Sequence, residues 1–177
     1  LQEPIISSPY FNKLNSYLNQ FNAKNIDRTT CAHIDRLADA DVLLALSGSG
    51  LNSGKKMVQN NKTYICERGS SHIIYQNNIL SDECKEYTNK NFKIDNWVIE
   101  RELEEYDNAD IILVPSYFVK KTFEKFNINK TKILNYGVNT ESFFKDSNIK
   151  KSQKYFDILF IGQISLRKGL HYLIEAF

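Results

Sequence analysis

The stretch that decides the fold class is Asp41-Val42-Leu43-Leu44-Ala45-Leu46-Ser47-Gly48-Ser49-Gly50. Its apolar part has the length of a buried β-strand, and a polar, glycine-rich turn ends it. A segment compatible with a helix, residues 51–60, follows directly. This order of strand, loop and helix is typical of one unit of an α/β protein with a parallel sheet.

The same order recurs along the chain. Apolar runs of strand length lie at residues 63–66, 110–114 and 132–134, and segments with helical spacing lie at residues 10–21, 73–87, 94–106 and 116–126. Short strands separated by helices predict a Rossmann-like parallel sheet with flanking helices, buried on both faces. Ligands of such sheets bind at the carboxyl ends of the strands, where most of the chemically capable residues of this chain lie.

One of these helices, residues 94–106, carries an acidic face made of Glu100, Glu102, Glu104 and Glu105. We expect this face to be exposed and solvated.

Composition excludes several classes of function. The 177 residues are 42% hydrophobic and 25% charged, and the net charge of +2 gives no footprint for nucleic acid. The three cysteines are widely spaced, odd in number and outside any metal-ligand pattern, as expected of free thiols in the reducing cytoplasm. No apolar run approaches the ~18 residues of a membrane span. We therefore expect a cytoplasmic protein.

A second strand-like run, Tyr155 to Ile161, breaks at Gly162, and a loop with Arg167, Lys168 and Gly169 leads into a helical pattern. A strand, a basic glycine loop and a helix form a place where backbone N–H groups and a lysine can meet a phosphate. The lysine-rich residues 140–154 before this unit read as a linker, with Phe143 and Phe144 packed against one domain.

Three motifs, in this order, resemble family 4 glycosyltransferases. They are Glu105-Tyr106-x-x-Ala109-Asp110-Ile111-Ile112-Leu113-Val114-Pro115-Ser116-x-Phe118-Val119-Lys120, then Tyr136-Gly137-Val138-Asn139-x-x-x-Phe143, and then Phe160-Ile161-Gly162 with Lys168-Gly169. That family has the GT-B architecture, in which two Rossmann-like domains face each other across a cleft. The resemblance spans about residues 40–177.

The resemblance implies a domain plan. Residues 1–139 correspond to the acceptor-side domain, incomplete at its N-terminus, residues 140–154 to the linker, and residues 155–177 to the start of the donor-binding domain. The family's first strand is expected before residue 1 and most of the donor domain after residue 177, so this piece alone is expected to be inactive.

The resemblance also implies the chemistry of the complete enzyme. A hexosyl-type transferase would move a sugar from a nucleotide-sugar donor to a saccharide or lipid-linked acceptor, with retention of configuration and without a metal or other cofactor. Peripheral association of the complete enzyme with a membrane is compatible with the resemblance.

On the donor side, Lys168 occupies the family's position for the lysine that pairs with the donor diphosphate, where charge develops as the glycosidic bond breaks. The arginine that often follows the family's glycine is replaced here by Gln163, and Arg167 either compensates or faces solvent. Gly162 either lets the backbone approach the donor closely or only forms a structural turn.

On the acceptor side, the polar set Glu67 to His72 follows a strand. His72 is the candidate catalytic residue that orients the sugar or an acceptor hydroxyl, although a lone histidine is often structural. Arg68 either binds an acceptor phosphate or pairs with Glu67 or Glu83. Ser70 is a candidate cap with outward amides.

Further candidates lie on neighbouring loops. Ser49 and Gly50 belong to a glycine-rich loop that lacks the Gly-Lys-Ser/Thr ending of a nucleoside-triphosphatase loop, so an acceptor-facing role is expected. Gly137 is expected to allow a bend at the cleft and Asn139 to approach the donor; structure alone would explain both.

Two alternatives to glycosyl transfer remain open at this point. One is a non-catalytic α/β module that binds a sugar or a nucleotide. The other is an epimerase or phosphorylase of similar architecture, of which a phosphorylase would need a pyridoxal lysine in its second domain.

Overall fold

The computed structural model describes residues 9–36, 39–146 and 154–177. The chain divides between Asn135 and Tyr136 into two compact units, each described by itself. The division falls close to residue 139, where the first domain was expected to end.

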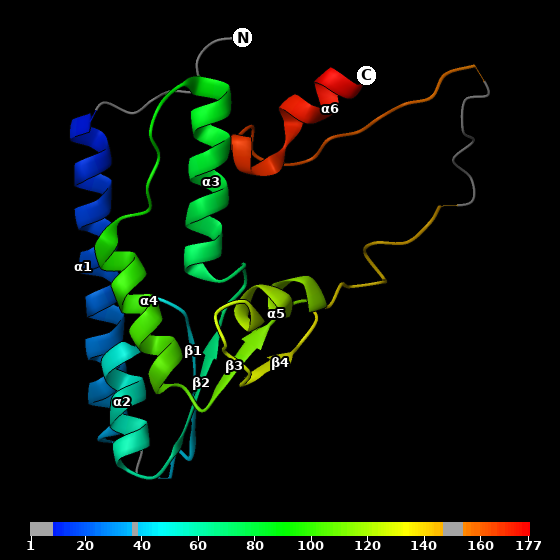
Figure 1. Cartoon of the computed structure of the whole chain (residues 1–177). Coiled ribbons are helices and arrows are strands. Elements are labelled where there is room, and N and C mark those ends of the chain that lie inside the picture. Colours follow the sequence, from blue (N-terminus) through cyan, green and yellow to red (C-terminus); the bar gives the residue numbers. More distant parts are fainter. Residues whose placement is uncertain (1–8, 37–38, 147–153) are drawn as a thin grey trace. The chain divides into compact units, whose positions relative to one another are not determined.

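The first unit contains a four-stranded parallel sheet (Figure 1). Each strand coincides with one of the apolar runs of the sequence, and the neighbours in the sheet are also neighbours in the sequence. The prediction of an α/β fold with a Rossmann-like parallel sheet is therefore confirmed. The strands, in both chain and sheet order, are β1 (Val42–Leu46), β2 (Thr63–Glu67), β3 (Ile111–Val114) and β4 (Thr131–Ile133).

Five helices accompany the sheet, and polar side chains cap the starts of several of them. The Asp95 carboxylate accepts from the Trp97 amide at 2.9 Å, and the Ser116 hydroxyl accepts from the Val119 amide at 3.3 Å. Figure 1 shows α1, α2 and α4 side by side. The helices are α1 (Pro9–Ile34), α2 (Leu51–Gln59), α3 (Ile73–Thr88), α4 (Asn96–Asn108) and α5 (Tyr117–Glu124).

The core lies on one face of the sheet. Alternate residues of the two central strands point into it and are buried, among them Tyr64 and Ile112. Met57 of α2, Tyr106 of α4 and Phe123 of α5 pack in the same cluster and are fully buried. These three helices therefore cover this face.

The opposite face is different. Val42, Leu44 and Leu46 of β1 are 56%, 52% and 63% exposed. The register pairs Leu44 with Ile65 and Ile65 with Ile111, so the exposed side chains belong to one face of the sheet. The expectation of a sheet buried on both faces is wrong for the described residues, because right-handed crossovers between strands in sequential order place their helices on the same face.

The second unit contains two short helical segments, η1 (Leu166–Lys168), a 3-10 helix, and α6 (Leu170–Ala176). The strand predicted over residues 155–161 does not form: this segment is irregular, and Phe156, Leu159 and Ile161 are each at least 80% exposed. A strand needs a neighbour for its backbone hydrogen bonds, and no described segment pairs with this one. Phe143 and Phe144 are exposed rather than packed as expected.

Candidate functional site

The carboxyl edge of the sheet brings two predicted loops together. The loop after β1, Ser47–Gly50, and the loop after β2, Arg68–His72, are side by side because β1 and β2 are adjacent and parallel. The Ser47 amide donates to the Glu67 carbonyl at 2.9 Å, and an Arg68 Nη1 donates to the Ser47 hydroxyl at 3.2 Å. The prediction that these loops share one edge is confirmed.

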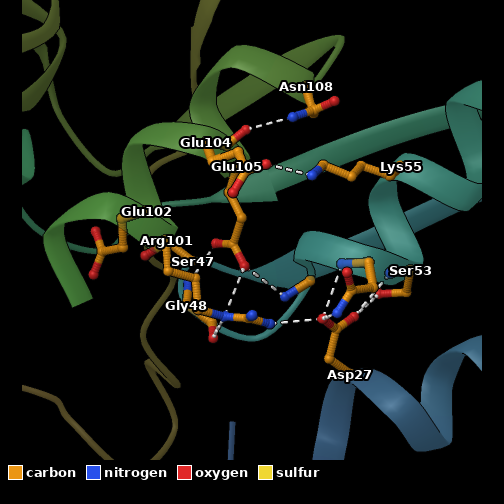
Figure 2. A network of polar contacts seen from close by, with 12 residues as sticks. Asp27, Ser47, Gly48, Ser53, Lys55, Arg101, Glu102, Glu104, Glu105 and Asn108 are labelled. Carbon is orange, nitrogen blue, oxygen red and sulfur yellow. Dashed lines mark hydrogen bonds and ion pairs between the residues drawn. The ribbon is translucent and has the colours of Figure 1, made fainter. Parts of the chain in front are cut away.

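The Ser47–Gly50 loop, here called the first glycine loop, is held by a carboxylate from α4. Glu105 is fully buried, and its two oxygens accept the backbone amides of Gly48 and, at 2.8 Å, of Gly50 (Figure 2). Two backbone N–H groups that converge on one carboxylate form the kind of concavity that binds anions. Here the anion is part of the protein.

Arg101, one turn before Glu105 on α4, holds the same loop from its other side. Its Nε donates to the Gly48 carbonyl at 2.7 Å and lies 3.7 Å from the Glu105 carboxylate (Figure 2). Its Nη2 donates to Asp27 of α1 at 2.6 Å. The Gly48 residue is thus clamped through both its N–H and its C=O by side chains of one helix.

Asp27 completes the network at the start of α2. It is fully buried and accepts the amides of Asn52 and Ser53 at 2.9 and 2.8 Å, together with the Ser53 hydroxyl at 2.7 Å. The residue before the helix, Gly50, has no side chain that can cap it. An aspartate from another helix therefore satisfies the first amides of α2 and complements its positive end.

Burial raises the pKa of both carboxylates of the network, but the net shifts are opposite. Burial raises the pKa of Glu105 to about 7, against the amides of Gly48 and Gly50 and the charge of Arg101, which favour the ionised form. For Asp27, burial also raises the pKa, but hydrogen bonds from Asn52 and Ser53 outweigh it, and the pKa ends below its ordinary value. Glu105 is therefore the member of the network that changes its charge near neutral pH.

Glycine is required at this loop for two reasons. A Cβ at Gly50 would lie 2.6 Å from the Ala45 Cβ and 2.8 Å from the Tyr64 hydroxyl. Gly48 has a φ of +88°, which side chains disfavour. The glycines thus serve the close packing of the loop against the sheet.

Arg68 has most of its hydrogen-bonding capacity filled by the protein. It pairs with Glu102 of α4 at 3.0 Å, and its other donors reach the Ser47 hydroxyl, the Gln76 side chain at 2.9 Å and the Ser71 carbonyl at 3.2 Å. Arg68 does form an ion pair, but with Glu102 of α4, a carboxylate that differs from the expected Glu67 or Glu83. An acceptor phosphate would compete with these partners, so binding of phosphate by Arg68 stays a prediction.

The acidic face predicted for α4 is wrong for two of its four members. Glu102 is 4% and Glu105 0% exposed, whereas Glu100 and Glu104 are exposed. Burial raises the pKa of Glu102, while Arg68 and the Tyr106 hydroxyl, which donates to it at 2.6 Å, favour its ionised form. Their spacing places these carboxylates on the side of α4 that faces the sheet, where Arg68 and the loop amides replace water as partners.

His72 lies inside the first unit. Its ring is 1% exposed and stacks on Phe126 at 4.0 Å, and its Nδ1 accepts the Ile74 amide at the start of α3. Burial, with the charge of Arg68, lowers the pKa of His72 to about 4, so the ring is neutral at neutral pH. This position favours the structural alternative, and a catalytic role for His72 stays a prediction.

The remaining acceptor-side candidates are placed as follows. Ser70 is not the cap of α3, because His72 takes that position; the Ser70 hydroxyl donates to Gln76 at 3.0 Å, and Ser49 is half-buried in the first glycine loop. Gly137 and Asn139 belong to the second unit; Gly137 has open space where a Cβ would lie, and the Asn139 side chain accepts the Glu141 amide. Their predicted roles at a cleft stay predictions.

The loop Gly162–Gly169, here called the second glycine loop, has a different character. Arg167 and Lys168 are exposed, and neither forms an ion pair with any residue in the described part of the chain. Gly169 has a φ of +67° and turns the chain from η1 into α6. The second glycine loop thus presents two cations to solvent.

The sequence analysis missed the roles of Asp27 and Arg101. The spacing of Arg101 and Glu105 by one helical turn is a signal for a pair on one face. Asp27 gave no such signal, since it lies 74 residues from Arg101 in the sequence.

Within residues 9–36, 39–146 and 154–177, no three His, Cys, Asp or Glu side chains are grouped as a metal site would require. The helices in the same ranges are all too short or too polar to cross a membrane. No protein-family model, no curated protein and no solved structure matches the chain.

Proposed function

We propose that this chain is part of a retaining glycosyltransferase of GT-B architecture, similar to family 4. The complete enzyme would move a hexosyl group from a nucleotide-sugar to a saccharide or lipid-linked acceptor. The observation that carries the proposal is the second glycine loop, whose two exposed cations have no carboxylate partner among the described residues. The ordered motifs of residues 105–169 and the parallel sheet support it.

The proposed roles follow from the charge that develops in the reaction. The bond between the sugar C1 and the diphosphate oxygen breaks, and negative charge accumulates on that oxygen. Lys168, assisted by Arg167, stabilises this charge if the loop holds it beside the diphosphate. The acceptor hydroxyl forms the new bond to C1 on the same face, and its proton passes to the leaving phosphate oxygen.

The acceptor would meet the carboxyl edge of the sheet in the first unit. Ser49 and Ser70 offer hydroxyl groups on the two neighbouring loops, and Arg68 fixes those loops through Ser47 and Ser71. The first glycine loop is an unsuitable diphosphate site, because Glu105 occupies its amides. This separation supports the assignment of donor and acceptor to different units.

The test is an assay of the complete gene product with a panel of nucleotide-sugars carrying a labelled sugar. We expect release of the nucleoside diphosphate together with transfer of the sugar. The product's anomeric configuration, read from its NMR coupling constants, should equal that of the donor. Binding of a nucleotide-sugar without any turnover would instead support a non-catalytic module, and inversion of configuration would exclude the proposed reaction class.

A further inference from the structure

The sequence motif that contains Glu105 does not explain the contacts of this side chain in the structure. It comes from α4, yet both of its oxygens are used by the loop that follows β1. The carboxylate is fully buried, so water does not share in its solvation. The first glycine loop and the charge on Glu105 therefore depend on each other.

The hydrogen-bond chemistry of a carboxylate gives this dependence a direction. An ionised carboxylate accepts through both oxygens, which matches the two amides of Gly48 and Gly50. A protonated carboxyl has one oxygen that carries a hydrogen and faces an N–H group with it. That oxygen is a poorer acceptor than a carboxylate oxygen, so one of the two amide bonds is weakened, while the Gly48 carbonyl remains held by Arg101.

We propose that Glu105 is the positioning residue of the first glycine loop: its ionised form holds the loop closed, and its protonation releases one of the two glycine amides. The proposed effect of Glu105 on the loop rests only on the contacts described above. Its consequence, that acceptor binding at the carboxyl edge responds to pH, rests on the proposed function.

The charged and titratable groups near Glu105 lie on α4, α1 and β2. On α4 these are Arg101 and Glu102, and across Arg101 lies Asp27 of α1. The side chains of Tyr64 and Cys66 on β2 also face it, and both stay protonated because burial raises their pKa. Arg68 is paired with Glu102.

Among the charged residues of α2, Lys55 pairs with Glu104 and Lys56 with Asp35. Burial raises the pKa of Glu105 to about 7 in this surrounding, which places the release within the physiological range.

The experiment is a pH titration of the 15N-labelled 177-residue chain by NMR. The amide resonances of Gly48 and Gly50 should shift together with a midpoint near pH 7, because the same carboxylate accepts both. Below the midpoint, one of the two amides should lose protection from hydrogen exchange by about tenfold or more, as expected for a bond to a charged acceptor. In Glu105→Gln the titration should vanish. In Glu104→Gln, a control on the exposed side of α4, it should remain.

A second measurement keeps the test independent of the variants' folding. The Glu105 carboxyl carbon of the unmodified chain, labelled with 13C, should titrate at the same midpoint as the two amides. Amide resonances that stay constant while the carboxyl titrates would overturn the proposal, as would a Gly48 and Gly50 titration that persists in Glu105→Gln. Neither readout involves a sugar, so absence of glycosyl transfer would count against the proposed function and leave this inference standing.

Discussion

The first and the second glycine loop are built to a similar plan but differ in what surrounds them. Each has a glycine with positive φ, Gly48 in the first and Gly169 in the second, and leads into a helix, α2 in one case and α6 in the other. In the first loop, two amides donate to Glu105 and the start of the helix is capped by Asp27. In the second, the side chains of Arg167 and Lys168 are exposed and have no ion-pair partner among the described residues.

The comparison of the two loops shows that a glycine loop after a strand is not by itself an anion site. The amides of Gly48 and Gly50 join the first loop to α4, and the amides at the start of α2 join that helix to Asp27 of α1, so both sets contribute to stability. The second loop keeps its positive charge available. Changes in the first loop should therefore affect folding, and changes in the second should affect binding and turnover.

The largest effect is expected from Asp27→Ala. The substitution leaves Arg101 buried without its closest carboxylate and uncaps α2, and loss of one partner of a buried ion pair costs about 3–5 kcal/mol. Urea unfolding followed by circular dichroism measures this. The matched control is Asp35→Ala, whose pair with Lys56 is largely exposed and should cost less than ~1 kcal/mol. Equal losses for the two variants would show that the network is not a stabilising element.

For the second loop, the proposed function predicts that Lys168→Ala in the complete gene product lowers turnover by roughly two to three orders of magnitude, the equivalent of about 3–4 kcal/mol at a developing oxyanion. Arg167→Ala should cost less, because its position in the loop is less determined. Steady-state kinetics measures both, and thermal melts should show unchanged folding. Near-native turnover of Lys168→Ala with an inactive Arg167→Ala would reverse the two roles.

Alanine substitutions at Gly50 and Gly169 distinguish the energetic cost of close packing from the cost of a positive φ. In Gly50→Ala the new Cβ would lie 2.6 Å from the Ala45 Cβ, and such overpacking should destabilise the first unit by about 1–3 kcal/mol. Gly169→Ala meets no atom closer than 3.7 Å and only suffers from its φ of +67°, at a cost of roughly 1 kcal/mol. Unfolding curves of both variants test this order, and a larger loss for Gly169→Ala would contradict it.

The last expected effect is a gradual change of stability with pH. Because the pKa of Glu105 in the folded chain, about 7, lies above its ordinary value of 4.5, folding retains a proton that the unfolded chain releases. This stabilisation is fully present below pH 4.5 and is lost as the pH rises through 7. For one group the slope cannot exceed about 1.4 kcal/mol per pH unit.

His72 acts in the opposite direction, so the measurement must isolate Glu105. The pKa of His72 is lowered from 6.5 to about 4, and its contribution to stability is lost as the pH falls from 6.5 through 4. The difference in unfolding free energy between the unmodified chain and Glu105→Gln removes this term. That difference should fall steadily from pH 4.5 to 7, and a flat difference would argue against a buried, titrating Glu105.

Local patterns in the sequence were sufficient to predict the strands of the first unit and most of its helices. An apolar run between turn residues, such as residues 42–46, becomes a strand wherever neighbours can pair with it. The run at residues 155–161 has the same composition and stays irregular, because pairing depends on partners that the pattern does not contain. An apolar run therefore indicates that a segment can form a strand, but whether it does depends on a neighbouring strand in the folded chain.

The character of the first glycine loop could not be predicted in this way. Its amides are filled by Glu105, which lies 55 residues from Gly50, and the helix is capped by Asp27 from 26 residues before Ser53. A helical wheel of α4 assigns Glu105 to an acidic face without showing that this face turns toward a loop. Contacts between distant elements decide whether a glycine loop is open, and only the folded arrangement contains them.

The most direct test of the contrast between the two loops is a titration of the 15N-labelled chain with inorganic pyrophosphate, followed by NMR. We expect weak binding with shifts confined to the amides around Arg167, Lys168 and Gly169, and no change at Gly48 or Gly50, whose amides Glu105 already occupies. Shifts at Gly48 and Gly50 with none around Lys168 would contradict the proposed difference between the loops, because the diphosphate would then bind the loop whose amides Glu105 occupies.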